Sequence, residues 1–184
     1  MSLTLSWDLF VVVFFAIITC YSFIIGKNQA MKVILATYIS IIATQGIGNV
    51  IVRLTGESTA LMQVMGVAFN FTVLSVVKIF LFALFIILFA IRSGIDLTYS
   101  RESGTTMNVV FTALFGFATA GLIVSTILTY ATTNGIISAS SLSDVAVQPV
   151  LQGSALMQLM ILNQDIWFTL PAFLIIAAGF AHRD

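Results

Sequence analysis

The residue best placed for chemistry is Lys78, the one charged side chain deep inside a long apolar stretch, residues 69–91. A charge in hydrocarbon is costly, so such a residue usually faces the inside of a helical bundle or a wet cavity. Asp8 and Asp165 each begin another apolar stretch at a comparable depth and would neutralise Lys78 as ion-pair partners. Two uses fit: a transport or gating site, and a lysine whose long side chain reaches outward to the membrane surface.

Three more polar side chains, each four residues from the next, lie at the end of another apolar stretch, residues 32–52: Gln45 and Asn49 inside it and Arg53 directly after it. On a helix this spacing places them along one side. Polar side chains in lipid need partners and commonly hydrogen-bond one helix to its neighbour. The stripe therefore either joins helices or lines a polar path.

Small residues gather in the stretch 107–130, where Gly116 and Ala120 stand four apart, Ala113 precedes them and Gly121 follows. Small residues at this spacing let two helix backbones approach closely. The pattern predicts tight helix packing and gives no information about a substrate.

Signatures of catalysis or metal binding are weak. The chain has one histidine, His182, near its C-terminus, and no arrangement of a nucleophile with a base. Four methionines form two pairs three residues apart, which a soft ion such as Cu(I) accepts but which more often fill apolar cores: Met62 with Met65, and Met157 with Met160. We expect a protein that is not an enzyme and has no metal or cofactor.

The elements that must position these residues are apolar helices. Hydrophobic residues make up 60% of the 184, charged residues only 8%, and the mean hydropathy is +1.13. A bilayer crossing needs about 20 apolar residues. We expect an all-α, polytopic helical membrane protein, with residues 1–184 forming one bundle. Its five predicted transmembrane helices cover about residues 8–25, 32–52, 69–91, 107–130 and 166–180.

Two further helices are expected at one surface of the bundle, over about residues 58–66 and 150–162. Residues 58–65 and 153–160 are nearly the same octapeptide, and each precedes a predicted span. This likeness indicates either a duplicated helical hairpin or two similar helices built independently from few residue types. Both segments would lie at the outer membrane surface or re-enter the membrane.

The distribution of basic residues predicts the orientation. Five crossings place the termini on opposite sides, and one side carries most of the basic residues: Lys27, Lys32, Arg92, Arg101 and Arg183. The other side has only Arg53 outside the membrane. The positive-inside rule then places the N-terminus outside and the C-terminus in the cytoplasm. The seven basic and seven acidic residues cancel, so we expect no nucleic-acid partner.

The arrangement resembles the colicin V production protein family of bacterial inner-membrane proteins. The likeness is carried by residues 7–9 at the start of the first helix, a Gly26-Lys27 turn at its end, and a basic residue, Lys32, that opens the second helix. It is carried most of all by residues 107–125, which look like the family's asparagine-containing, glycine-spaced fourth helix. The chain departs from that pattern at Thr112 and Ala120, where the family favours glycine.

The resemblance implies a multi-pass inner-membrane protein that assists secretion of a peptide toxin or maintenance of the cell envelope. Our leading hypothesis is therefore a non-enzymatic integral protein of the bacterial cytoplasmic membrane. It would act through helix–helix contacts, as a homo-oligomer or with another membrane protein. The alternative is a small-solute channel or transporter that uses Lys78 and the stripe of Gln45, Asn49 and Arg53.

Overall fold

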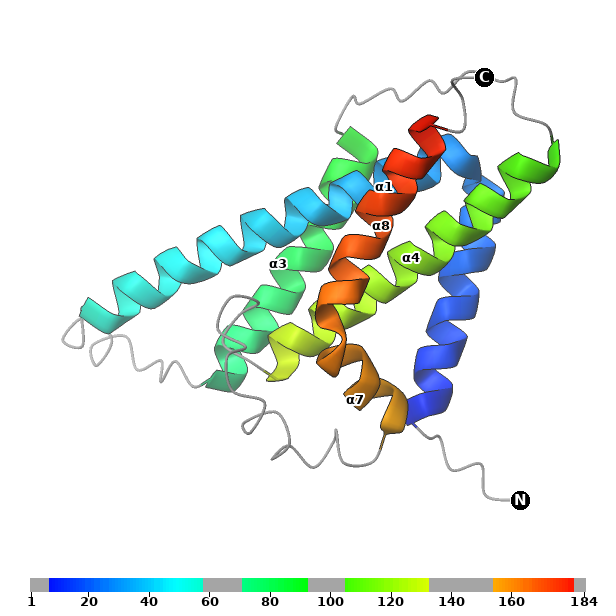
Figure 1. Ribbon diagram of the computed structural model, residues 1–184. Helices are drawn as coiled ribbons and strands as arrows, with labels where there is room; N and C mark the ends of the chain where they lie inside the picture. Colours follow the sequence, from blue (N-terminus) through cyan, green and yellow to red (C-terminus); the bar gives the residue numbers. More distant parts are fainter. Residues whose placement is uncertain (1–6, 58–70, 93–104, 133–153, 181–184) are drawn as a thin grey trace.

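The structure is a computed structural model that describes residues 7–57, 71–92, 105–132 and 154–180. Within these ranges the chain forms five α-helices. They are α1 (Trp7–Glu57), α3 (Phe71–Arg92), α4 (Thr105–Thr132), α7 (Ala155–Leu162) and α8 (Gln164–Phe180), and Figure 1 shows how they are arranged. The all-helical class predicted from the sequence is confirmed for this part of the chain.

Helix α1 combines two of the predicted spans, residues 8–25 and 32–52. Its 51 residues are continuous except at Gly26, whose φ of 80° and ψ of 168° lie outside the helical region. Glycine has no Cβ and adopts a positive φ without steric cost. The polar stop expected after the first span is therefore a kink, and the helix resumes directly behind it. We call residues 7–25 the first arm and residues 27–57 the second arm.

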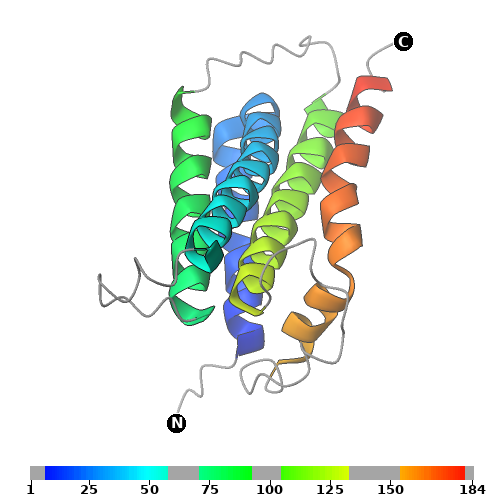
Figure 2. The same cartoon turned by 90° about the vertical axis from the view of Figure 1, so that its left-hand side faces the viewer.

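Helix α4 is the centre of the bundle. In the most apolar 18 residues of each long helix, 67% of the residues of α4 are buried, compared with 17% in α3 and 11% in α1. It packs against α1, α3, α7 and α8. Figure 2 shows α3 and α8 on opposite sides of the bundle, with α1 and α4 between them, and with the start of α1 and the end of α8 at opposite ends of the molecule.

Among the described helices, three contain a stretch long and apolar enough to cross a membrane, within residues 8–51, 75–92 and 106–131. Helices α7 and α8 pass this test only as a pair, bent by 68°. The reason is length, because the 17 residues of α8 extend roughly 26 Å, less than a hydrocarbon core of about 30 Å. The predicted span over residues 166–180 is thus the longer part of a broken helix.

Helix α7 occupies part of the predicted outer helix over residues 150–162. Ser154 caps its first turn, where the Ser154 Oγ accepts a hydrogen bond of 3.1 Å from the backbone N–H of Met157. The helix ends at Asn163, where the chain bends into α8. The other predicted outer helix, residues 58–66, lies outside the described residues.

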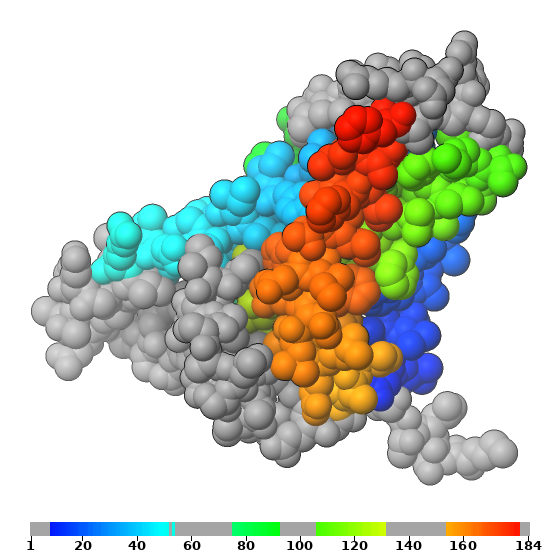
Figure 3. Space-filling model, viewed as in Figure 1, coloured from blue at the N-terminus to red at the C-terminus, as the bar shows by residue number. Residues whose placement is uncertain are grey.

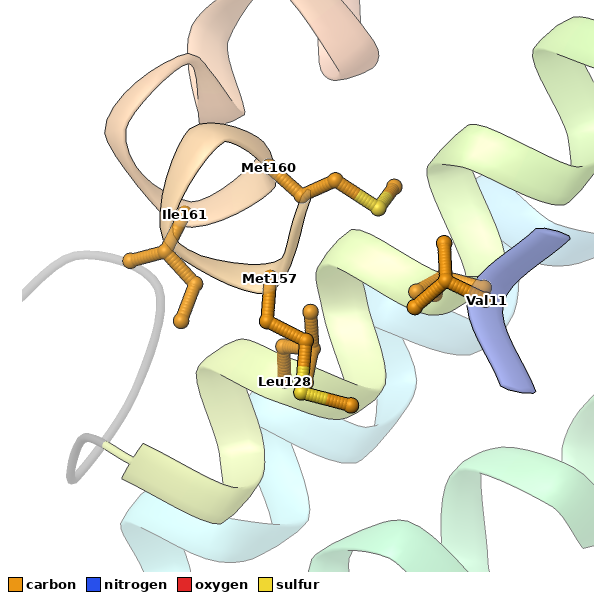
Figure 4. Close-up of a cluster of buried hydrophobic side chains, with 6 residues drawn as sticks. Val11, Leu128, Met157, Met160 and Ile161 are labelled. Carbon is orange, nitrogen blue, oxygen red and sulfur yellow. The ribbon is translucent and has the colours of Figure 1, made fainter. Parts of the chain in front are cut away.

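The methionines of α7 are part of the apolar core. Met157 and Met160 are 3% and 2% exposed and pack in one cluster with residues of α1 and α4. Figure 4 shows both side chains pointing from α7 toward α4 and toward Val11 of α1. This placement supports their interpretation as apolar filling.

Candidate functional site

The interior of the bundle is rich in hydroxyl groups, most of which are satisfied within their own helix. Hydroxyl hydrogens of buried serines and threonines are donated to the carbonyl four residues earlier, as from Thr37 to Val33 at 2.8 Å and from Thr126 to Leu122 at 2.7 Å. This local bonding is a common way to place hydroxyls in a low-dielectric interior. The same bond is made by Ser40, Thr112, Thr119 and Thr129. The other buried serines and threonines are Ser22, Thr44, Ser75, Ser125 and Ser154.

Lys78 lies inside this polar interior, with only 2% of its surface exposed. Its side chain crosses the backbone of α1 at Gly48. A Cβ added at Gly48 would lie 2.7 Å from the Lys78 Cε and 3.6 Å from its Cδ and Cγ. The absence of a side chain at position 48 therefore creates the space that the lysine occupies between α3 and α1.

Polar atoms without partners lie on the same face of α1 as Gly48. Thr44 Oγ1 and Gln45 Oε1 are both buried, and neither has a hydrogen bond within the described part of the chain. Ser75, one turn before Lys78 on α3, is 8% exposed. A buried polar atom without a partner destabilises a protein, and a bound water or ion is one explanation for such atoms in native structures. We call Thr44, Gln45, Gly48, Ser75 and Lys78 the Lys78 site.

An apolar layer closes one side of the Lys78 site. Phe82, one turn after Lys78, packs with Ile41, Leu122 and Tyr130 in a single buried cluster. The Phe82 and Tyr130 rings meet edge to face with centroids 5.9 Å apart. The Tyr130 hydroxyl donates to the Ile41 carbonyl at 3.3 Å, which joins α4 to α1 across the layer.

Beyond this layer the same three helices enclose an apolar crevice of about 270 Å³. Its floor includes Gly116 and Thr119 of α4, and its walls include Val33 of α1 together with Ile86 and Ile87 of α3. Crevice, apolar layer and Lys78 site follow one another toward the C-terminal end of α1 and, in the reverse chain direction, toward the N-terminal end of α3. The three features therefore lie in sequence along one interface.

The two predicted acidic partners of Lys78 lie elsewhere. The Asp8 Oδ1 accepts hydrogen bonds from the Ser154 hydroxyl and from the Leu156 N–H, the latter at 3.2 Å. It thus ties the start of α1 to the free N–H groups at the start of α7, where a negative charge is favoured. Asp165 is exposed on the first turn of α8. Figure 2 shows α8 on the far side of the bundle from α3, which carries Lys78. The prediction that Asp8 or Asp165 pairs with Lys78 is therefore wrong.

The stripe of Gln45, Asn49 and Arg53 is divided between two environments. Gln45 is half-buried at the Lys78 site, whereas Asn49 and Arg53 are exposed. Each step of four residues turns a helix by about 40° beyond a full circle, so the stripe curves away from the interface within two steps. It does not line one interior path.

The small residues of α4 bring two other helices close. A Cβ added at Gly116 would lie 2.7 Å from the Ser22 Cβ and 3.0 Å from the Thr19 Cα of α1. The Ser22 hydroxyl donates to the Thr112 carbonyl at 3.1 Å beside this contact. Ala120 is fully buried and Ala113 is half-buried. The predicted packing surface thus receives the first arm of α1 within the same chain.

Gly121 receives α8 on another side of α4. The Trp167 ring lies so close that a Cβ added at Gly121 would be 2.9 Å from its Cδ2 and nearer still to Cε3 and Cζ3. Phe15 and Phe117 each have their ring centroid 5.6 Å from that of Trp167. The Trp167 Nε1 is buried and has no hydrogen-bond partner in the described chain.

Sequence reasoning missed Gly48 and the apolar layer at Phe82 and Tyr130. A glycine inside a long apolar helix with no turn beside it is the signal that would have indicated Gly48, because it marks a close approach. Within the described residues no group of three or more His, Cys, Asp or Glu side chains is placed to hold a metal ion. The Lys78 site combines the cation of Lys78 with the hydroxyls of Thr44 and Ser75.

No family model, curated protein or solved structure matches this chain. The resemblance to the colicin V production protein family stays a prediction from the sequence pattern.

Proposed function

We propose that the protein is a multi-pass protein of the bacterial cytoplasmic membrane that crosses it five times, with the N-terminus outside and the C-terminus in the cytoplasm. The two arms of α1, together with α3, α4 and the bent α7–α8 pair, supply the five crossings. The start of α1 and the end of α8 lie at opposite ends of the bundle, which supports an odd number of crossings (Figure 2). Lys27 at the kink and Arg92 at the end of α3 support the cytoplasmic side.

Within this frame, we propose that the protein is a non-enzymatic carrier of a small polar solute. The observation that carries the proposal is Lys78, a cation 2% exposed in the interior of an apolar bundle. Ionisable residues held inside membrane proteins commonly mark the path of a substrate, an ion or a proton. The crevice, the apolar layer and the Lys78 site follow one another along the same interface of α1, α3 and α4.

The chemistry of the site favours an anionic solute. Lys78 supplies a positive charge where the low dielectric strengthens its attraction for an anion. Thr44 supplies a hydroxyl whose oxygen has no partner in the described chain. The apolar layer at Phe82 and Tyr130 separates this site from the crevice, so movement of that layer would connect one side of the bundle to the other.

The test is flux into liposomes that contain the purified protein. We expect uptake of small carboxylates, followed with radiolabelled acids. Lys78→Met keeps the length of the side chain and removes its charge, and we expect it to abolish uptake. Val76→Met is the matched control, because Val76 lies on the same helix with 61% of its surface exposed.

The expected result requires that both variants elute from size-exclusion chromatography as the unmodified protein does. Uptake that survives Lys78→Met in a folded protein refutes the carrier. Uptake that is lost equally in Val76→Met shows damage to the helix in general and also counts against the site.

A second candidate function is an accessory that acts through its helix surfaces, in toxin secretion or envelope maintenance. The observation that favours it is the second arm of α1, which extends past the rest of the bundle with apolar residues exposed (Figure 3). Under this function, Lys78→Met leaves peptide-toxin export by intact cells unchanged. Substitutions on the exposed face of the second arm reduce that export.

A further inference from the structure

One face of the second arm of α1 has the spacing of a helix-pairing seam. Its members alternate three and four residues apart, at positions 39, 42, 46, 49 and 53, and all of them are exposed: Ile39, Ile42, Gly46, Asn49 and Arg53. This alternation is the repeat by which two helices pack along a shared stripe. Within the described chain no other helix covers this face, which we call the α1 seam.

The α1 seam is built for close approach at its middle. A Cβ added at Gly46 would meet nothing within 4 Å, so the backbone is open there. By contrast, the other face of the same helix is occupied at Gly48 by Lys78. Small residues on an exposed helix face within a membrane allow two backbones to come together.

Asn49 supplies a second and independent feature, a polar amide exposed one turn after Gly46. Asn49 lies within residues 8–51, a stretch of α1 that is long and apolar enough to cross a membrane. In such a setting an amide forms hydrogen bonds with another helix. An asparagine side chain both donates and accepts, so its own copy is a complementary partner, whereas a charged residue repels its copy.

We propose that the α1 seam pairs with the same seam of a second copy of this chain. Both copies have the same orientation in the membrane, so the two seams run parallel about a twofold axis along the membrane normal. Gly46 lies at the closest approach and Asn49 bonds to the partner's Asn49. Arg53 lies nearest the membrane surface, where its long side chain extends into water and the two charges separate.

This pairing is distinct from the proposed carrier activity, because the α1 seam and the Lys78 site lie on different faces of one helix. Loss of pairing therefore leaves the polar interior intact. Pairing gains no hydrophobic free energy, because the lipid chains that leave the seam are as apolar as the seam itself. Packing at Gly46 and the amide bond at Asn49 must supply the stability.

Disulfide cross-linking in native membranes tests the seam. On a Cys20→Ala background, which removes the exposed native thiol, single cysteines replace Ile42, Gly46 and Asn49. Ile47→Cys is the matched control, because Ile47 is 38% exposed but lies about 100° around the helix from Gly46. Copper phenanthroline should convert the three seam variants to covalent dimers and leave the control monomeric.

Any of three results would overturn the proposal: cross-linking at Ile47 equal to that at the seam, a cross-linked product that contains a different protein, or no dimer at any seam position. A second measurement uses mass in detergent by light scattering. The double variant Gly46→Leu/Asn49→Leu should dissociate at concentrations where the unmodified protein is dimeric, with Asn49→Leu alone weakening the dimer about tenfold. Ile47→Leu should leave the mass unchanged. A dimer that persists in the double variant refutes the seam.

Discussion

The contact between Gly121 of α4 and Trp167 of α8 makes the sharpest prediction about stability. Ordinary contact of a Cβ begins at 3.4 Å, and the Cδ2 of Trp167 would lie 2.9 Å from a Cβ at position 121. To restore ordinary contact, the Trp167 ring in Gly121→Ala must withdraw by about half an ångström at this atom and by more at Cε3 and Cζ3. A rigid indole cannot do so without moving α8 or leaving its aromatic neighbours.

The expected cost follows from two opposing effects. Overpacking of this kind destabilises proteins by about 1–3 kcal/mol, and displacement of the ring also weakens its two contacts with Phe15 and Phe117, each of about 0.5–1.5 kcal/mol. In the opposite direction, replacing glycine by alanine inside a helix stabilises the helix by about 1 kcal/mol. We expect Gly121→Ala to lower the free energy of unfolding by about 2 kcal/mol.

The assay is unfolding in bicelles by steric trapping, at concentrations where the protein is monomeric. Gly46→Ala serves as the control, because it makes the same change in a helix where the added Cβ meets nothing within 4 Å. We expect it to be neutral or slightly stabilising. Trp167→Leu removes the ring, so in that background Gly121→Ala should lose most of its cost.

A Gly121→Ala variant as harmless as Gly46→Ala would refute the clash with Trp167. An unchanged cost of Gly121→Ala in the Trp167→Leu background would refute it as well, because the damage would then come from the α4 backbone and not from the ring. A coupling energy of about 1 kcal/mol or more between positions 121 and 167 would support the contact.

Two further predictions concern the kink and the cap. Gly26→Ala should destabilise the protein by about 1–2 kcal/mol in the same assay, because its φ of 80° is unfavourable for a residue with a Cβ; an unchanged stability would show that the kink does not need glycine. Asp8→Leu should speed hydrogen exchange in the first turn of α7 about fivefold, from loss of about 1 kcal/mol of capping, whereas Asp8→Asn, which keeps an acceptor, should have little effect. Equal exchange in both variants would remove Asp8 from the cap.

The helices themselves could be predicted from local sequence. The stretches 69–91 and 107–130 became α3 and α4 with ends that differ by one or two residues at most. Long apolar runs bounded by polar or basic residues determine a helix locally, because each backbone group bonds within its own segment. Gly26 was also recognisable as an interruption, although hydropathy does not distinguish a loop from a kink.

The partners of individual side chains depended on the tertiary structure. Lys78 was recognised as an interior charge, but its position on Gly48 depends on how α3 crosses α1. The sequence places Asp8 as a partner of Lys78, but Asp8 instead caps α7, where it accepts a hydrogen bond from Leu156, 148 residues later in the chain. Residues so far apart leave no trace of their contact in local spacing.

Composition and the length of the apolar runs are enough to predict a set of apolar helices with Lys78 inside one of them, because both act on the backbone of each segment separately. Which helix faces meet depends on contacts between distant segments. The small residues of α4 were visible as a packing surface, but their assignment to Ser22 and Trp167 follows from the geometry of the crossings. Periodicity shows which side of a helix is adapted for contact, and the three-dimensional fold selects what contacts it.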